Sequence, residues 1–376
     1  MASENPAPAL ARPIPERIKE AREARGLSAE ELAEALGVSR QAVAQYETGQ
    51  TTPSADALRG ILRETGQSLS FFTTLPHRPS DPKSPFFRSL KRMQAHHRRR
   101  IYRRLQWTGD IVSFLERYLE LPPVDLPDVP FCSESATDEE IEAAAEALRD
   151  HWGLGRGPVR NLAEIAEAHG VLIVRDIVRC PDMDAVSCWI GGRSIVLLSA
   201  EVISGPRDLF NLSHELAHLV LHAGEEVSSE NLDRLEKQAN KFASAFLLPQ
   251  SSFSREVLGT SLGYFLTLKD RWGVSIGAMA MRCKALGIFS DNQTSYLFRQ
   301  LNAQGIRKAE PLDDIIPVAQ PHVLPEGISM LLKHGVCTPS EIEESLGLNL
   351  CDVEQLCSLD PATLDQKVVS IQLRNG

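Results

Sequence analysis

The chain has 376 residues, of which 43% are hydrophobic and 24% are charged, and its formal net charge is −10. This length and composition predict two or three domains of an ordinary soluble protein. No apolar run reaches the roughly 18 residues of a membrane helix, and the first residues lack the pattern of a signal peptide. The seven cysteines are scattered without a C-x-x-C pair, which indicates a reduced, cytoplasmic protein without cysteine-bound zinc.

Several short helices are predicted in residues 15–66, after a Pro- and Ala-rich start that we expect to be disordered. Ser28 and Glu31 form a capping box at the start of one helix, Gly37 ends it, and Ser39 caps the next. The apolar residues expected to hold these two helices together are Leu32, Ala33, Leu36, Val38 and Val43. A helix, a short glycine turn and a second helix form a helix-turn-helix.

Residues 16–66 resemble the XRE or phage-repressor-like class over nearly their whole length, including Tyr46-Glu47-x-Gly49 and Pro53-Ser54. The resemblance implies a recognition helix, residues 39–46, in the major groove of an operator, and an internal ion pair between Arg17 and Glu47. Arginine can bind guanine and glutamine can bind adenine, while hydroxyl groups contact phosphates. The residues expected to contact DNA are Ser39, Arg40, Gln41, Gln45 and Thr51.

Charge does not settle this assignment. Residues 1–70 hold eight basic and ten acidic residues, so a helix-turn-helix that contacts only protein is the alternative. A linker with four prolines follows at 75–85, and residues 83–104 then contain nine Lys or Arg and no acid. This basic stretch begins a helix predicted over 86–119. It could add contacts to the DNA backbone or pair with an acidic helix at 136–152, and both possibilities stay open.

The middle of the chain changes its periodicity twice. After helices at 136–152, with Thr137 as N-cap, and 159–169, β-like patterns occur at 171–177 and 187–199. Gly191-Gly192 divides the second pattern and predicts a hairpin. The later helices are expected at 207–222 and 231–248, with more to about 302. The predicted fold class is α+β, mainly α with a small β-sheet.

The helix predicted at 207–222 contains His214-Glu215-x-x-His218. Positions four apart lie on one face of a helix, so both imidazoles can reach one metal ion. Zinc suits two histidines, one carboxylate and a water. Glu215 is the candidate general base that activates the zinc-bound water for peptide hydrolysis. The alternative is a structural helix with two incidental histidines.

The third ligand is expected from the next helix, where Asp233 and Glu236 are the candidates and Glu236 borders the apolar stripe. His222 also follows at a spacing of four. It lies ~12 Å from His214 along the helix axis, too far for one zinc ion. We therefore interpret His222 as a helix C-terminal cap favoured by the helix dipole.

Residues 135–300 resemble the ImmA/IrrE family of zinc metallopeptidases. The similarity lies in Asp184-Ala185-Val186-Ser187, in Arg207 and Phe210 before HELAHLVLH, and in a second signature that runs from Glu236 to Ala243 before Leu247-Leu248-Pro249. The resemblance implies that Glu236 is the third ligand of one zinc ion per chain, as in gluzincins. It also implies limited proteolysis of particular proteins, often transcriptional repressors. For the oxyanion donor, Arg207 and Asn240 are only guesses.

Residues 303–376 are predicted to be mainly helical. Thr338 or Ser340 caps one helix, Gly347 ends it, and the segment weakly resembles a second helix-turn-helix without basic groove-facing residues. Packing or dimerisation is its expected role. The expected domains are an XRE-like domain at 1–74, a linker with the basic helix at 75–134, a zincin-like peptidase domain at 135–302 and a small C-terminal helical domain at 303–376.

Together these motifs predict a cytoplasmic, DNA-binding regulator fused to a zinc metalloendopeptidase that cleaves a regulatory protein, such as a repressor in a stress response. A homodimer on a palindromic operator is expected by analogy. One rival is a transcription factor whose metal site is a sensor or a remnant. Another is an antitoxin-like interaction protein that regulates its own operon. An intact Glu215 disfavours the first rival, because a structural metal site needs no base.

Overall fold

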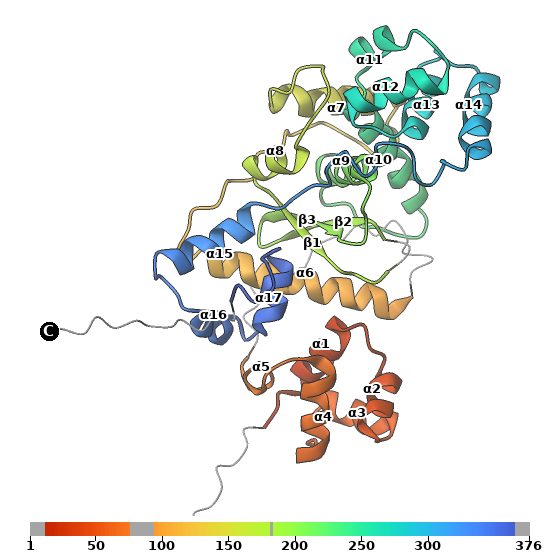
Figure 1. Ribbon diagram of the computed structural model, residues 1–376. Helices are drawn as coiled ribbons and strands as arrows, with labels where there is room; N and C mark the ends of the chain where they lie inside the picture. Colours follow the sequence, from red (N-terminus) through yellow and green to blue (C-terminus); the bar gives the residue numbers. More distant parts are fainter. Residues whose placement is uncertain (1–11, 76–93, 181–182, 365–376) are drawn as a thin grey trace, which may run out of the picture. The chain divides into compact units, whose positions relative to one another are not determined.

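The computed structural model describes residues 12–75, 94–180 and 183–364. The fold is mainly α with one small sheet, which confirms the expected α+β class (Figure 1). The chain forms two compact units, which we describe separately. The first comprises Met1–Pro79, Gln94–Leu119 and Gly327–Gly376, and the second comprises Ser80–Met93 and Glu120–Glu326. No helix among the described residues has the length and apolar character needed to cross a membrane.

The first unit begins with the helix-turn-helix. Its helices are α1 (Pro15–Ala24), α2 (Ala29–Leu36), α3 (Arg40–Glu47), α4 (Ala55–Thr65) and α5 (Leu69–Thr73). Ser28 and Glu31 form the predicted capping box, Gly37 ends α2 in the left-handed conformation, and Ser39 caps α3. Leu32, Ala33 and Val43 form the buried contact between α2 and α3. The local rules of capping and glycine termination therefore determine this motif.

Three further helices, α6 (Ala95–Leu115), α16 (Pro339–Leu346) and α17 (Leu350–Leu356), belong entirely to the same unit. The predicted start of the basic helix, 86–93, lies outside the described residues. Thr338 forms a capping box with Glu341, and Gly347 ends α16, as expected. Helix α15 (Val323–Lys333) spans the boundary between the units. The separate C-terminal domain suggested for 303–376 stays a prediction.

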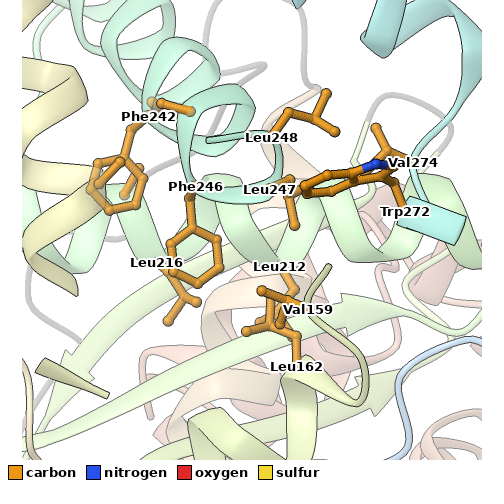
Figure 2. Close-up of a cluster of buried hydrophobic side chains, with 14 of the residues drawn as sticks. Val159, Leu162, Leu212, Leu216, Phe242, Phe246, Leu247, Leu248, Trp272 and Val274 are labelled. Carbon is orange, nitrogen blue, oxygen red and sulfur yellow. The ribbon is translucent and has the colours of Figure 1, made fainter. Parts of the chain in front are cut away.

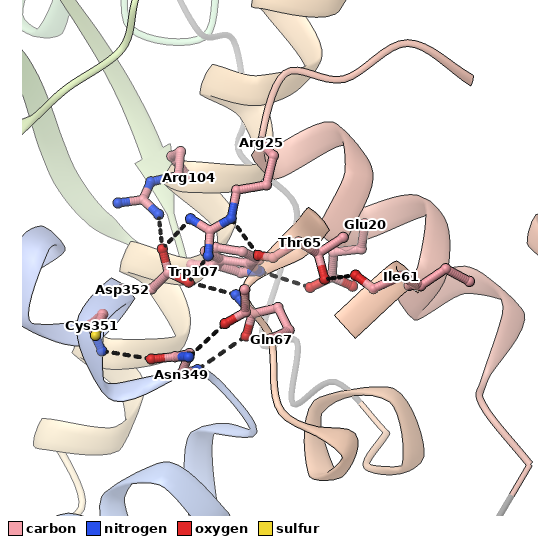
Figure 3. A network of polar contacts seen from close by, with 11 residues as sticks. Glu20, Arg25, Ile61, Thr65, Gln67, Arg104, Trp107, Asn349, Cys351 and Asp352 are labelled. Atoms are coloured by element: carbon pink, nitrogen blue, oxygen red, sulfur yellow. Dashed lines mark hydrogen bonds and ion pairs between the residues drawn. The ribbon is translucent and has the colours of Figure 1, made fainter. Parts of the chain in front are cut away.

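Asp352 joins three distant segments of the first unit (Figure 3). Arg25 donates two hydrogen bonds to its carboxylate, at 2.8 and 2.7 Å, and Arg104 donates one at 2.6 Å. Gln67 also donates to this carboxylate. Asp352 is buried. Burial opposes its ionisation, but the charges of Arg104 and Arg25 outweigh that effect and lower the pKa of Asp352. Helices α1, α6 and α17 are thus joined through one buried anion.

We expect Asp352→Asn to lower the free energy of unfolding by about 3 kcal/mol, since the buried Arg104 and the half-buried Arg25 would lose the anion that pairs with them. Chemical denaturation of the full chain measures this change. Asp360 is exposed, so Asp360→Asn is the matched control and should change stability little. Equal effects of the two substitutions would contradict the role assigned to the buried cluster.

The second unit contains the sheet. Its strands are β1 (Val171–Asp176), β2 (Ala185–Ile190) and β3 (Arg193–Ser199). Gly191 and Gly192, both with positive φ, form the predicted hairpin turn between β2 and β3. The sequence did not predict that β1 pairs with β3 in parallel, which gives the order β1-β3-β2. Strand β2 consequently lies at one edge of this sheet.

Eight helices of the second unit lie between α6 and α15 in the chain. They are α7 (Asp138–His151), α8 (Leu162–Ala168), α9 (Gly205–Leu221), α10 (Leu232–Leu247), α11 (Gln250–Glu256), α12 (Leu262–Trp272), α13 (Ile276–Ala285) and α14 (Asp291–Ala303). The first four agree with the helices predicted from periodicity, and the last four lie in the stretch to about residue 302 where further helices were expected. Thr137 caps α7 and forms a capping box with Glu140.

The main core of this unit is formed by side chains of the sheet and of the helices from α7 to α14, and Figure 2 shows part of it. Leu212 and Leu216 of α9 and Phe242 and Phe246 of α10 are fully buried within it. Trp272, at the end of α12, belongs to the same cluster. Full burial of such side chains contributes about 1.5–3 kcal/mol each. This packing sets the spacing between α9 and α10, and both helices also carry polar residues.

Candidate metal centre

Helix α9 carries the two histidines of the HExxH motif. Ser204 caps its first turn by accepting a hydrogen bond from the Arg207 backbone, and Pro206 lies in that turn, where no donor is lost. His214 and His218 follow one helical turn apart, and their ring centroids are 4.8 Å apart. Both side chains are buried. The helical spacing therefore points two imidazoles into the same small volume.

Glu236 on α10 completes the cluster. The Nε2 atoms of His214 and His218 are 3.2 Å apart, and the Glu236 oxygens lie 3.3 Å from His214 Nε2 and 3.5 Å from His218 Nε2. In a tetrahedral site with zinc bonds of ~2.0–2.1 Å, neighbouring ligand atoms lie about 3.3–3.4 Å apart. These are the three residues whose ligand atoms converge on one possible ion position. The donor set and its spacing thus fit a small divalent cation such as zinc.

The ionisation states also suit a metal ion. Burial lowers the pKa of His218 to about 3, so the ring is neutral at physiological pH. Burial opposes ionisation of Glu236, but the contacts with His214 and His218 outweigh it and lower its pKa to about 2. A neutral imidazole and an ionised carboxylate are the forms that bind metal. No proton has to leave either group before a cation binds near pH 7.

Glu215 lies beside the cluster, and its environment differs from that of Glu236. Ser187 on β2 donates a hydrogen bond of 2.7 Å to Glu215 Oε2. Burial raises the pKa of Glu215 to about 7, although the charge of His214 and the bond from Ser187 oppose the shift. A carboxyl group with a pKa near neutrality can both accept and return a proton. A cation in the cluster would favour its ionised form and lower this pKa.

A chain of hydrogen bonds extends from His218 away from the cluster. Its Nδ1 lies 3.0 Å from His222 Nδ1, and His222 Nε2 lies 3.0 Å from Gln238 Oε1. The Gln238 amide donates to the Ser133 carbonyl at 2.7 Å, which directs Oε1 toward His222. His222 then carries its proton on Nε2 and accepts at Nδ1, so His218 donates from Nδ1. The Nε2 lone pair of His218 consequently faces Glu236 and His214.

The residues predicted to belong to the site differ in where the structure places them. Glu236 joins the cluster, whereas the reserve candidate Asp233 is exposed. His222 is the C-cap residue of α9, as expected, but burial lowers its pKa to about 4. A neutral ring gains nothing from the helix dipole, so that explanation of His222 was wrong. Arg207 pairs with Asp184, and Asn240 donates to the Glu236 carbonyl of its own helix, so neither is assigned to the oxyanion.

Sequence reasoning missed the partners of the motif. Ser187 and Gln238 were noted only within the segments that resemble the ImmA/IrrE family. The spacing of four between His218 and His222 could have indicated their contact. No sequence signal points to Ser133, whose contribution is a backbone carbonyl.

A pocket of about 1390 Å³ opens beside the first half of α9. Phe210 and Asn211, about one turn before His214, help to line it, together with the paired Asp184 and Arg207. Asn211 is buried, and its amide nitrogen has no hydrogen-bond partner among the described residues. The pocket therefore offers an apolar ring and an unused donor close to the metal-ligand cluster along α9.

In the helix-turn-helix, Ser39, Arg40, Gln41 and Thr51 are exposed, and Gln45 is half-buried. The hydroxyl group of Ser39 caps α3 by accepting from the Ala42 backbone. The exposed positions on α3 present side chains that could contact a duplex.

The expected ion pair between Arg17 and Glu47 was wrong. Arg22 forms a bidentate ion pair with Glu47, while Arg17 donates hydrogen bonds to Glu20 and the Phe71 carbonyl. The two arginines lie five positions apart on α1, so they point in different directions. Packing of α1 against α3 decides which arginine meets Glu47.

Comparison with protein families agrees with this architecture. Residues 166–284 match the peptidase M78 family, described as the IrrE N-terminal-like domain, and residues 18–72 match a helix-turn-helix family. The chain therefore contains one segment similar to each of these two domains. No curated protein gives a significant match to it. The first match runs from within α8 to within α13 and contains the His-His-Glu cluster. The second match runs from within α1 to within α5.

Glu215 makes stability depend on pH in the metal-free protein. Its folded pKa of about 7 exceeds the unfolded value of 4.5, so its contribution is full below pH 4.5 and is lost as pH rises through 7. Glu215→Gln cannot ionise and avoids that loss. We expect the variant to be more stable than the wild type at pH 8 by on the order of 3 kcal/mol, but not at pH 4.

Urea denaturation with a chelator at both pH values measures this difference. Glu230 is exposed, so Glu230→Gln is the control and should behave like the wild type throughout. A stability gain of Glu215→Gln that is equal at pH 4 and pH 8 would refute the assignment.

Proposed function

We propose that the protein is a cytoplasmic DNA-binding regulator with a zinc metalloendopeptidase that cleaves a specific regulatory protein, such as a transcriptional repressor. The observation that carries the proposal is the convergence of His214, His218 and Glu236 within 3.2–3.5 Å of one another, beside Glu215. A purely structural metal site has no use for a buried carboxyl group that lies beside the ligands and is not one of them.

The chain's own residues supply positioning and proton transfer. Zinc, held by the two histidines and Glu236, would supply a Lewis acid that activates water and polarises the scissile carbonyl. Ser187 holds Glu215 Oε2, which leaves Oε1 for taking the proton from the attacking water. Glu215 then returns that proton to the leaving amine. Gln238 and His222 keep His218 in the tautomer whose Nε2 is a ligand.

The sheet offers a place for the substrate. Strand β2 lies at the edge of the order β1-β3-β2, and its Ser187 reaches Glu215. An extended peptide that adds to this edge would run past the base, with its backbone held by main-chain hydrogen bonds. The pocket lined by Phe210 and Asn211 would hold a substrate side chain. Selection of one protein rather than many peptides fits such an arrangement.

The proposed regulatory partner is operator DNA, which the helix-turn-helix would bind. Arg40 and Gln41 are exposed on α3, where a recognition helix presents its base-reading side chains. We propose that they bind base edges of an operator, with Gln45 beside them, and that Ser39 and Thr51 contact phosphates. All seven cysteines are free thiols in the structure, in keeping with the proposed cytoplasmic location.

The test is a comparison of newly formed protein N-termini in host cells that carry either the wild type or Glu215→Gln. We expect a small number of cleavages in the wild type alone, under normal growth or stress, because the variant keeps all three metal ligands and loses the base. Bound zinc should be unchanged in the purified variant. If no cleavage depends on Glu215, the proposed peptidase is rejected in favour of a regulator with a non-catalytic metal site.

Gln238 provides a test of the metal centre that does not rely on proteolysis. Gln238→Leu removes the acceptor that fixes the His222 tautomer, so zinc affinity should fall 10- to 100-fold, as for other supporting residues of metal sites. Competition with a fluorescent chelator measures it. Gln238→Glu keeps an acceptor and should retain most of the affinity. The exposed Gln250→Leu is the control, and a loss of affinity equal to that of Gln238→Leu would contradict the tautomer argument.

A further inference from the structure

Helix α6 runs antiparallel along α1 in the first unit. Arg100 lies over Gly26, where an added Cβ would be 3.3 Å from its Cδ. Further along, Arg103 donates to Glu23 at 2.9 Å and Trp107 donates to Glu20 at 2.8 Å (Figure 3 shows the second contact). Because the two helices are antiparallel, the residues of α6 that precede Arg100 extend beyond the C-terminal end of α1. That is where the chain turns into α2.

The first turn of α2 confirms this register. Hydrogen bonds from Ser28 and, to a smaller extent, the charge of His96 lower the pKa of Glu31. His96 therefore lies near the N-terminal turn of α2. The first helix of a helix-turn-helix crosses the DNA backbone at its operator. Residues 95–100 thus lie beside the part of the motif that would be nearest to phosphate.

The start of α6 is basic, whereas the first turn of α2 beside it is acidic. The first turn of α2 carries Glu30 and Glu31, which would repel a phosphate, and residues 1–70 have eight basic against ten acidic residues. The segment AHHRRRIYRR, residues 95–104, has five arginines and no acid. Arg103 and Arg104 bind Glu23 and Asp352 and so attach α6 to the unit. Arg98 and Arg99 precede Arg103 in α6, and the Arg99 side chain, whose Nε lies 3.9 Å from Glu23 Oε1, is 52% exposed.

We propose that the basic first turns of α6 form a second DNA-contacting element, which binds duplex phosphates beside the segment that α3 reads. This inference rests on the proposed DNA binding and extends it beyond the residues that match the helix-turn-helix family, 18–72. Helix α6 supplies the positive charge that the motif itself lacks. Its arginines add affinity without sequence preference, because phosphates are the same at every base pair.

The probe is a fluorescent 30-base-pair duplex of random sequence, bound by the full-length protein over a series of salt concentrations. Neutralising two phosphate contacts should reduce the slope of log affinity against log salt by about 1.8. We expect this reduction, with weaker binding, for the double variant Arg98→Gln/Arg99→Gln. The charge-preserving variant Arg98→Lys/Arg99→Lys should keep most of the slope. The exposed pair Arg255→Gln/Arg299→Gln, on α11 and α14, removes the same charge and should leave the slope unchanged.

Each outcome is decisive. A wild-type slope in Arg98→Gln/Arg99→Gln, with intact DNA binding, overturns the role of α6 and leaves the proposed DNA-binding function standing. Failure of the wild type to bind the duplex at low salt overturns both. A reduction of the same size in Arg255→Gln/Arg299→Gln overturns a local contact, since net charge alone would then explain it. Selective loss of binding to phosphatidylserine vesicles would assign the segment to membrane lipid and overturn the proposal.

Discussion

The packing of α9 against α10 is the constraint on which the candidate metal centre depends. Three ligand atoms from two helices must come within 3.2–3.5 Å, and neither helix contains all three. Leu212 and Leu216 of α9 and Phe242 and Phe246 of α10 belong to one buried core, which sets the distance between the helix axes. A close-packed core resists changes in that distance. The position of Glu236 relative to the histidines is therefore a consequence of hydrophobic packing.

The two units bury charge in contrasting ways. In the first, Asp352 is surrounded by two arginines and an amide, so its charge is compensated and its role is to join segments. In the second, Glu215 is met by the neutral hydroxyl group of Ser187, and burial raises its pKa to about 7. Ionising a buried carboxyl group that has no cationic partner lowers the stability of the folded state. Carboxyl groups with such raised pKa values are concentrated at functional sites. A buried carboxyl group is therefore paired with cations in one unit and has a raised pKa in the other.

Much of the architecture could be predicted because it depends on local rules. The capping box of Ser28 and Glu31, the glycine that ends α2 and the Gly191-Gly192 turn each require only a few neighbouring residues. The fold class followed from the change of hydrophobic periodicity. Glu236 was chosen with the help of a family resemblance, because spacing alone left Asp233 open. The parallel pairing of β1 with β3 was not predicted, since it joins strands separated by another strand.

By itself, the sequence determined the helical face that carries His214 and His218 and the helix-turn-helix that carries Arg40 and Gln41. Both follow from the fixed geometry of one helical turn. Only the tertiary structure decided that Ser187 meets Glu215, that Gln238 orients His222, and that Arg22 rather than Arg17 meets Glu47. These partners lie 16 to 28 positions apart. Which of several polar residues meet over such distances depends on how helices and strands pack, and that packing is set by the whole core.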